Sequence, residues 1–155
     1  MTSAYSGRPL RLPVPPTALN MTALAMEASR SVEANTGKPL SFAIGSVAEV
    51  DGYLGEIREE VGGSDELAEL VLKFGAYLGE MIVRHKGGTW ADAPAEFDGW
   101  PVVQLPSGYW ADPIGKAFKR VDNGSEDSII SFVDVLADLG QTKPQRRFHL
   151  FKRRV

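Results

Sequence analysis

The sequence predicts an α+β fold: N-terminal helices around one central buried helix, a small antiparallel meander of about three strands, and two C-terminal helices. Three observations predict it. Apolar residues recur at helical spacing between residues 46 and 86. Short strand-like runs separated by Gly and Pro follow. Helical spacing then returns after Asp112-Pro113, an N-cap followed by proline at the first helical position. Helices on both sides of a meander are typical of the α+β class.

The 155-residue chain divides into three parts. Residues 1–16 contain four prolines, which block regular hydrogen bonding, and predict an extended or disordered arm. Residues 17–140 are expected to form a single α+β domain, because a chain of this length suits one core. Residues 141–155 hold six Lys or Arg and no acid, and predict a basic tail or, through "FHLF" at 148–151, a fourth strand at the sheet edge.

The first helix is predicted over about residues 17–33, and "LSFAIGS" after it is a candidate strand. Hydroxyl side chains mark the expected helix starts, since Ser and Thr accept hydrogen bonds from the free amides of the first turn. Ser46 and Glu49 match a capping box. The other expected N-caps are Thr17, Ser64 and Ser125.

The segment 65–86 is apolar around most of its circumference, which predicts a central, buried helix. Gly75 and Gly79 lie on one flank, where a missing side chain would let a neighbouring element approach closely. Only a narrow band of this helix is polar. Glu80 lies in that band, four residues before Arg84, a spacing typical of a surface ion pair.

The tetrapeptide Tyr-Leu-Gly-Glu occurs twice, at 53–56 and 77–80. It suggests either a duplicated site with Glu56 and Glu80 as paired carboxylates, or two similar amphipathic helices. In both copies Leu falls on the apolar face and Glu on the polar one. We therefore interpret the repeat as two helices.

The meander is predicted as a strand at 89–91, a second strand at about 100–105, a turn at Pro106-Ser107-Gly108 and a return strand at about 109–111. Because Tyr109 and Trp110 are adjacent, they should face opposite sides of the sheet. An exposed Trp or Tyr is a good anchor for a protein partner. The candidate binding residues are Trp90, Trp100, Tyr109 and Trp110.

Several classes of chemistry lack support in the sequence. The chain has no cysteine and two histidines, and no metal-binding or phosphate-binding motif, so we predict neither a metal nor a cofactor. Asp92, Glu96 and Asp98 form an acidic loop that is better explained as solvated than as a cation site. There is no apolar run of about 18 residues and no apolar leader segment, which favours a cytoplasmic protein that does not span a membrane.

Charge suggests the leading functional hypothesis. Residues 1–140 carry 20 acidic and 11 basic side chains, a net charge of −9, whereas the tail is strongly basic. An acidic body can bind a basic surface by charge complementarity. We therefore expect a non-catalytic, cytoplasmic protein-binding module, an adaptor or immunity-type protein of unknown target, which binds a protein either through the aromatic face of the meander or, where the partner is basic, through the acidic body. The sequence does not determine its oligomeric state.

Two other functions are considered. A small hydrolase or transferase would use Glu80, His85 and Asp112, although His85 near a helix C-terminus is also explained as a structural residue with a local hydrogen bond. Nucleic-acid contact would use the basic tail, whose Phe residues would stack on bases, but the acidic body argues against it. The tail residues concerned are Arg146, Arg147, Lys152, Arg153 and Arg154.

The run "FGAYLGEMIVRHKGGTW", followed by "PVVQLPSG" and "DPIGKAFKRV", resembles a diffuse set of small uncharacterised bacterial α+β proteins. The resemblance covers about residues 45–138. It implies the fold and no reaction. It also implies an accessory, immunity or adaptor role of the kind such proteins often have, and no catalytic residue is carried over.

Overall fold

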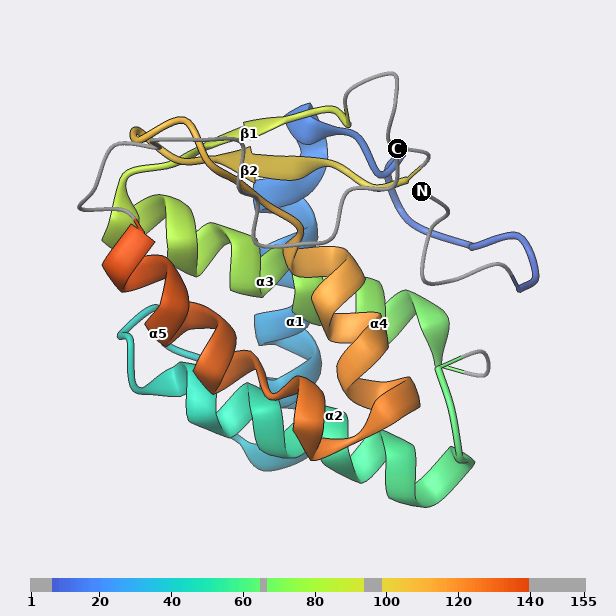
Figure 1. Ribbon diagram of the computed structural model, residues 1–155. Helices are drawn as coiled ribbons and strands as arrows, with labels where there is room; N and C mark the ends of the chain where they lie inside the picture. The colour runs from blue at the N-terminus through green and yellow to red at the C-terminus, as the bar shows by residue number, and fades with distance from the viewer. Residues whose placement is uncertain (1–6, 65–66, 94–98, 140–155) are drawn as a thin grey trace.

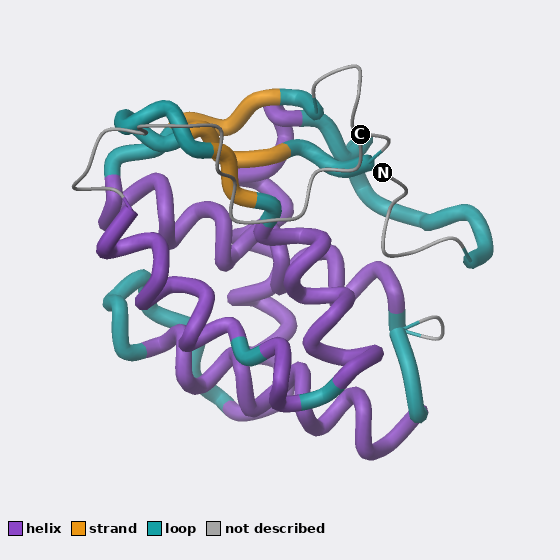
Figure 2. Tube along the Cα trace, viewed as in Figure 1, coloured by secondary structure: helices purple, strands orange, loops and turns teal. Residues whose placement is uncertain are grey.

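The computed structural model describes residues 7–64, 67–93 and 99–139. Five α-helices and one three-stranded antiparallel sheet make up this part of the chain, and the sheet lies over one side of the helices (Figures 1 and 2). The α+β prediction is confirmed. In chain order the elements are η1 (Ala18–Asn20), α1 (Met21–Thr36), α2 (Ser46–Val61), α3 (Ala68–Lys86), β1 (Thr89–Ala91), β2 (Val102–Gln104), β3 (Trp110–Ala111), α4 (Pro113–Asn123), η2 (Ser125–Asp127) and α5 (Ile129–Leu139).

Helix α3 is the central helix, as predicted. It packs most extensively against α1 and α4, which lie on either side of it, and it also contacts the sheet (Figure 1). Gly75 and Gly79 make the contact with α4 and β1 possible. A Cβ atom on Gly75 would lie 2.6 Å from the Cα of Ile114 in α4, and one on Gly79 would lie 2.1 Å from the ring of Trp90. The predicted close approach at both glycines is therefore confirmed.

The sheet has the order β1-β2-β3, with Trp90 opposite Val103 and Gln104 opposite Trp110. Leu105 and Tyr109 close the hairpin, since the amide of Leu105 donates to the carbonyl of Tyr109 over 2.8 Å. The strand at 89–91 and the hairpin turn are confirmed. The residues of "LSFAIGS" form no strand and lead by turns into α2, so that prediction was wrong.

The expected hydroxyl N-caps are wrong at all four starts. Thr17 precedes the short helix η1 and makes no side-chain cap, while α1 begins only at Met21. Ser46 lies inside the first turn of α2, where its hydroxyl pairs with that of Ser41 at 2.8 Å, so no capping box forms. Ser64 bonds instead to the carboxylate of Asp122.

At the last helix the position of the cap is shifted. Ser125 begins η2, and the hydroxyl of Ser128 accepts from the amide of Ile130 at the start of α5. By contrast, the Asp112 cap is confirmed, because its carboxylate accepts from the amide of Gly115 at 2.9 Å. No helix in the described part of the chain is long and apolar enough to cross a membrane.

Two buried or half-buried carboxylates connect the helices. Asp51 of α2 accepts from Arg120 of α4 at 3.0 Å and from the amide of Ile129 at the start of α5 at 2.9 Å. Glu80 of α3 is only 6% exposed, so its predicted surface position was wrong. It accepts from Thr22 of α1 at 2.9 Å and from the indole of Trp90 at 3.4 Å, and it retains the predicted pair with Arg84.

Candidate functional site

A cleft of about 430 Å³ opens between the end of α1, the second half of α2 and the first half of α3. We call it the acidic groove. Its volume falls within the range of about 300–1,000 Å³ that is usual for ligand pockets. The described residues that line it are Ser31, Val32, Asn35, Thr36, Tyr53, Glu56, Ile57, Glu60, Leu67, Leu70 and Phe74.

The floor of the acidic groove is apolar. Val32, Ile57 and Phe74 are buried and come from three different helices. The ring of Tyr53 stacks on that of Phe74, with 5.9 Å between the centroids and 11° between the planes. Leu70 is half-buried and also lines the groove. These surfaces are positioned by core packing, so they are ready to receive an apolar side chain without rearrangement.

Tyr53 is held in place at both ends. Its hydroxyl donates to the carboxylate of Glu49 at 2.9 Å, four residues earlier on α2. Burial raises the pKa of Tyr53, and the hydrogen bond to Glu49 and the charges of Glu49 and Glu56 raise it further. The phenol therefore stays protonated at neutral pH and adds no charge of its own to the groove.

Two carboxylates form the rim. Glu56 and Glu60 are both exposed and are separated by four residues on α2, about 6 Å along the helix axis. Like charges at this spacing destabilise a helix by a few tenths of a kcal/mol. Neither forms an ion pair with any residue that the structure describes. The rim is therefore a local concentration of uncompensated negative charge.

The nearby cations are engaged elsewhere. Arg58, which lies between the two rim residues in sequence, faces α4 and donates to the carbonyl of Val121 at 2.9 Å. Arg30 of α1 and Lys73 of α3 both approach Glu27, at 2.6 and 3.9 Å. No Lys or Arg is among the described residues that line the groove. None of the described lining residues would therefore compete with an added basic group for the rim carboxylates.

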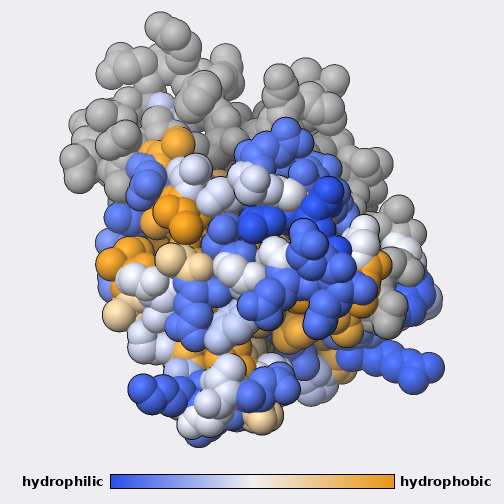
Figure 3. Space-filling view, turned by 90° about the horizontal axis from the view of Figure 1, so that it is seen from below, coloured by the Kyte–Doolittle hydropathy of each residue, from blue (hydrophilic) through white to orange (hydrophobic). Residues whose placement is uncertain are grey.

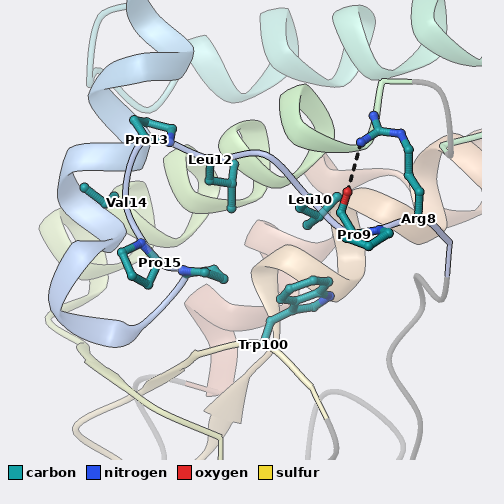
Figure 4. A pocket seen from close by; sticks show the side chains of 9 residues that line it. Arg8, Pro9, Leu10, Leu12, Pro13, Val14, Pro15 and Trp100 are labelled. Carbon is teal, nitrogen blue, oxygen red and sulfur yellow. Dashed lines mark hydrogen bonds between the residues drawn. The ribbon is translucent and has the colours of Figure 1, made fainter.

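A second cleft, of about 530 Å³, lies under the N-terminal arm and is lined by residues 8–10 and 12–16 with Trp100 (Figure 4). Residues 7–16 form no helix or strand, and Leu10, Leu12 and Val14 pack against the core. Glu69 of α3 holds it, since Arg8 donates to both of its carboxylate oxygens at 2.6 Å. We call this second cleft the arm cleft.

The arm cleft offers little for recognition. Its lining is almost entirely apolar, and its one charged residue, Arg8, is already paired with Glu69. The indole nitrogen of Trp100 is buried and has no hydrogen-bond partner among the described residues, but its ring stacks on Phe118 at 5.9 Å as part of the core. The acidic groove is therefore the better candidate.

The four predicted aromatic residues do not gather on one exposed surface. Tyr109 is buried, at 6% exposure, whereas Trp110 is half-buried on β3. Trp90 turns toward Gly79 and Glu80, and Trp100 lies at the arm. The structure brings none of the four to the acidic groove. Their role in binding stays a prediction.

The three residues of the enzyme hypothesis are engaged separately. Glu80 is bonded inside the core as described above. The ring of His85 is exposed at the end of α3 and hydrogen-bonds the carbonyl of Phe42, 43 residues earlier in the chain, at 2.6 Å. Asp112 caps α4, and burial raises its pKa. None of the three lines either cleft.

The remaining predicted site residues lie partly outside the described residues. This applies to the five basic residues of the tail, to the strand at 148–151, and to Glu96 and Asp98 of the acidic loop. Asp92 is described, and its carboxylate accepts from the amide of Ala18 at 2.8 Å. No cluster of three or more potential metal ligands occurs in the described part of the chain.

Sequence reasoning missed the acidic groove. Glu56 and Glu60 have the pattern of solvated positions on a polar helix face, and Val32, Ile57 and Phe74 have the pattern of ordinary core residues. The one available signal was the series of acids at Glu49, Glu56 and Glu60 along one side of the second helix, with Tyr53 among them. Comparison with known proteins found no matching family, no matching curated protein and no matching solved structure. Function therefore has to be argued from the chemistry of the site.

Proposed function

We propose that this protein is a non-catalytic, cytoplasmic protein-binding module, an adaptor or immunity-type protein, which binds a basic and apolar segment of a partner in the acidic groove. The observation that carries the proposal is the combination of an apolar aromatic floor with two unpaired carboxylates at its rim. Such a site suits a peptide in which Phe or Leu side chains alternate with Lys or Arg.

The chemistry of the groove favours binding over catalysis. Its lining holds two carboxylates, a protonated phenol, two hydroxyls and an amide, and no histidine. The side chains of Asn35 and Thr36 donate to the carbonyls of Ser31 and Val32 in their own helix. None of these groups forms the nucleophile-and-base pair that group transfer needs. What the groove offers a ligand is an apolar surface and negative charge.

The surroundings support a charged partner. The face seen from below, toward α2, is mainly hydrophilic, and its hydrophobic groups lie in small separate areas (Figure 3). Such a face does not suit a large apolar interface. The net charge of −9 over residues 1–140 would accelerate association with a basic partner and make it sensitive to salt.

The test is selection from a random peptide library displayed on phage, with the full-length chain as bait. The proposal predicts selected peptides rich in Lys or Arg together with Phe or Leu. Glu56→Lys/Glu60→Lys should abolish their binding. The matched control is Glu59→Lys/Glu126→Lys, which makes the same change in net charge at exposed positions outside the groove and should leave binding within about threefold.

Two results would contradict the proposal. One is selection of acidic or purely apolar peptides. The other is equal loss of binding in both double variants, which would show that net charge rather than the groove attracts the peptides.

A further inference from the structure

We infer that the chain's own basic tail, residues 141–155, is an internal ligand of the acidic groove and occupies it until a partner displaces it. The inference rests on the proposed function, because both use the same groove. The tail adds a regulatory element to the proposed function, because a partner would have to compete with a segment that is always present.

The first support is charge complementarity. The tail carries six Lys or Arg and no acid, whereas the groove has two unpaired carboxylates and no cation among its described lining residues. The tail also contains Phe148, Leu150 and Phe151, and the groove has an apolar floor. The arm cleft, by contrast, has no acidic residue in its lining.

The second support is the alternation of residues in the tail. In an extended chain, every second side chain points to the same side. One side would then present two apolar residues with basic residues before and after them. Lys152 and Arg154, the two successive bases on that side, would be about 6.6 Å apart, close to the spacing of about 6 Å between Glu56 and Glu60. The residues of this side are Arg146, Phe148, Leu150, Lys152 and Arg154.

The third support is reach. Helix α5 ends at Leu139, and Phe148 follows nine residues later, a span of up to about 30 Å when extended. Helix α5 packs against α2, the helix that carries the two rim carboxylates, and α2, with 16 residues, is about 24 Å long. Tethering at this length gives an effective concentration in the millimolar range, so even a weak contact would be populated.

The consequence is a threshold for partners. If the tail occupies the groove in about two-thirds or more of the molecules, the apparent Kd of an external peptide is raised in inverse proportion to the free fraction, by about threefold or more. Neutralising the tail should therefore tighten the binding of such a peptide by at least about threefold. Salt should weaken the internal contact, because the rim carboxylates are exposed.

The experiment uses the absence of cysteine in the chain. The full-length His149→Cys variant, carrying a nitroxide spin label, is prepared with ¹⁵N, and the broadening of backbone amide signals is measured. The expected result is broadening at 53–60 and 67–74 that does not change on dilution. It should disappear in Glu56→Lys/Glu60→Lys and persist in Glu59→Lys/Glu126→Lys.

Three results would overturn the inference: no broadening at the groove, broadening that persists in Glu56→Lys/Glu60→Lys, or broadening only in mixtures where label and ¹⁵N are on different molecules. The last result would assign the groove to the tail of a second copy.

A second measurement separates this inference from the proposed function. A free peptide with the sequence of residues 144–155 is titrated onto a full-length chain in which the five basic residues from Arg146 to Arg154 are changed to Gln. If the peptide binds at the groove but the spin label broadens nothing, the tail inference fails and the proposed function stands. If the peptide does not bind and the spin label broadens no signal, the tail inference and the proposed function both fail.

Discussion

Alanine at Gly75 should destabilise the protein, although alanine is the better helix former. Replacing glycine inside a helix normally gains about 1 kcal/mol. Here the added Cβ would lie 2.6 Å from the Cα of Ile114, a backbone atom of α4 that no rotamer change can move. Overpacking of this kind costs about 1–3 kcal/mol, and contact with backbone favours the upper half of that range. The expected net loss is about 1–2 kcal/mol.

The matched control is Gly52→Ala in α2. Gly52 is exposed, and a Cβ there would meet nothing within 4 Å, so the same substitution should stabilise the protein by about 0.5–1 kcal/mol. For a chain of this size, 1 kcal/mol corresponds to about 2–4 °C in Tm. Thermal and urea unfolding followed by circular dichroism should therefore give Tm changes of opposite sign. If Gly75→Ala equals or exceeds the wild type in Tm while Gly52→Ala behaves as expected, α3 and α4 do not meet at this point.

Three further outcomes are expected. The stability of Asp112→Asn relative to the wild type should rise with pH. Burial raises the pKa of Asp112, so its contribution to the unfolding free energy of the wild type is present at low pH and is lost as pH rises through the folded-state pKa. Asn does not titrate, so the variant does not lose this contribution. Urea unfolding between pH 4 and 7 checks this, and the opposite trend would contradict it. Arg8→Ala should return the pKa of Glu69 from about 2 toward 4.5, measured by carbon NMR of its carboxyl group, because the Arg8 hydrogen bond is the main cause of the lowering. In the wild type this pair stabilises the arm above about pH 4.5 and is lost as pH falls through about 2, so an unchanged pKa in the variant would refute the assignment. Glu80→Ala should cost about 1–2 kcal/mol in unfolding free energy, because it leaves the half-buried indole donor of Trp90 without its acceptor, whereas the exposed Thr22 can bond to water instead; a loss below about 0.5 kcal/mol would show that the indole bond does not form.

Local signals in the sequence were sufficient for much of the fold. The periodicity of α3, the Pro-Ser-Gly turn of the hairpin and the Asp112-Pro113 helix start each depend on a few neighbouring residues, and all three appear as predicted. The predicted hydroxyl caps were wrong because a cap depends on the exact first residue of the helix. A serine caps only if it stands one position before the first helical residue, and Ser46 stands at that residue itself. Periodicity locates a helix end to within a few residues, which is too coarse for this purpose.

The acidic groove depends on contacts that are distant in sequence. Its floor combines α1, α2 and α3, and the sequence shows only that Val32, Ile57 and Phe74 lie on apolar faces. The pattern does not show whether another element covers these three residues completely. The same limit applies to Glu80, whose partner Thr22 is 58 residues away. Burial of a polar residue becomes predictable only once its hydrogen-bond partners are known.

The repeated Tyr-Leu-Gly-Glu shows how the site arises. Leu54 and Leu78 are buried alike, so both copies use the same apolar face. The glutamates differ because α3 is surrounded by α1, α4 and the sheet, whereas α2 has a side that no described element covers. Glu80 therefore meets donors from α1 and β1, while Glu56 stays at the rim of a cleft without a partner. Identical tetrapeptides thus give a structural carboxylate in one helix and an available one in the other, and only the available one can attract a ligand.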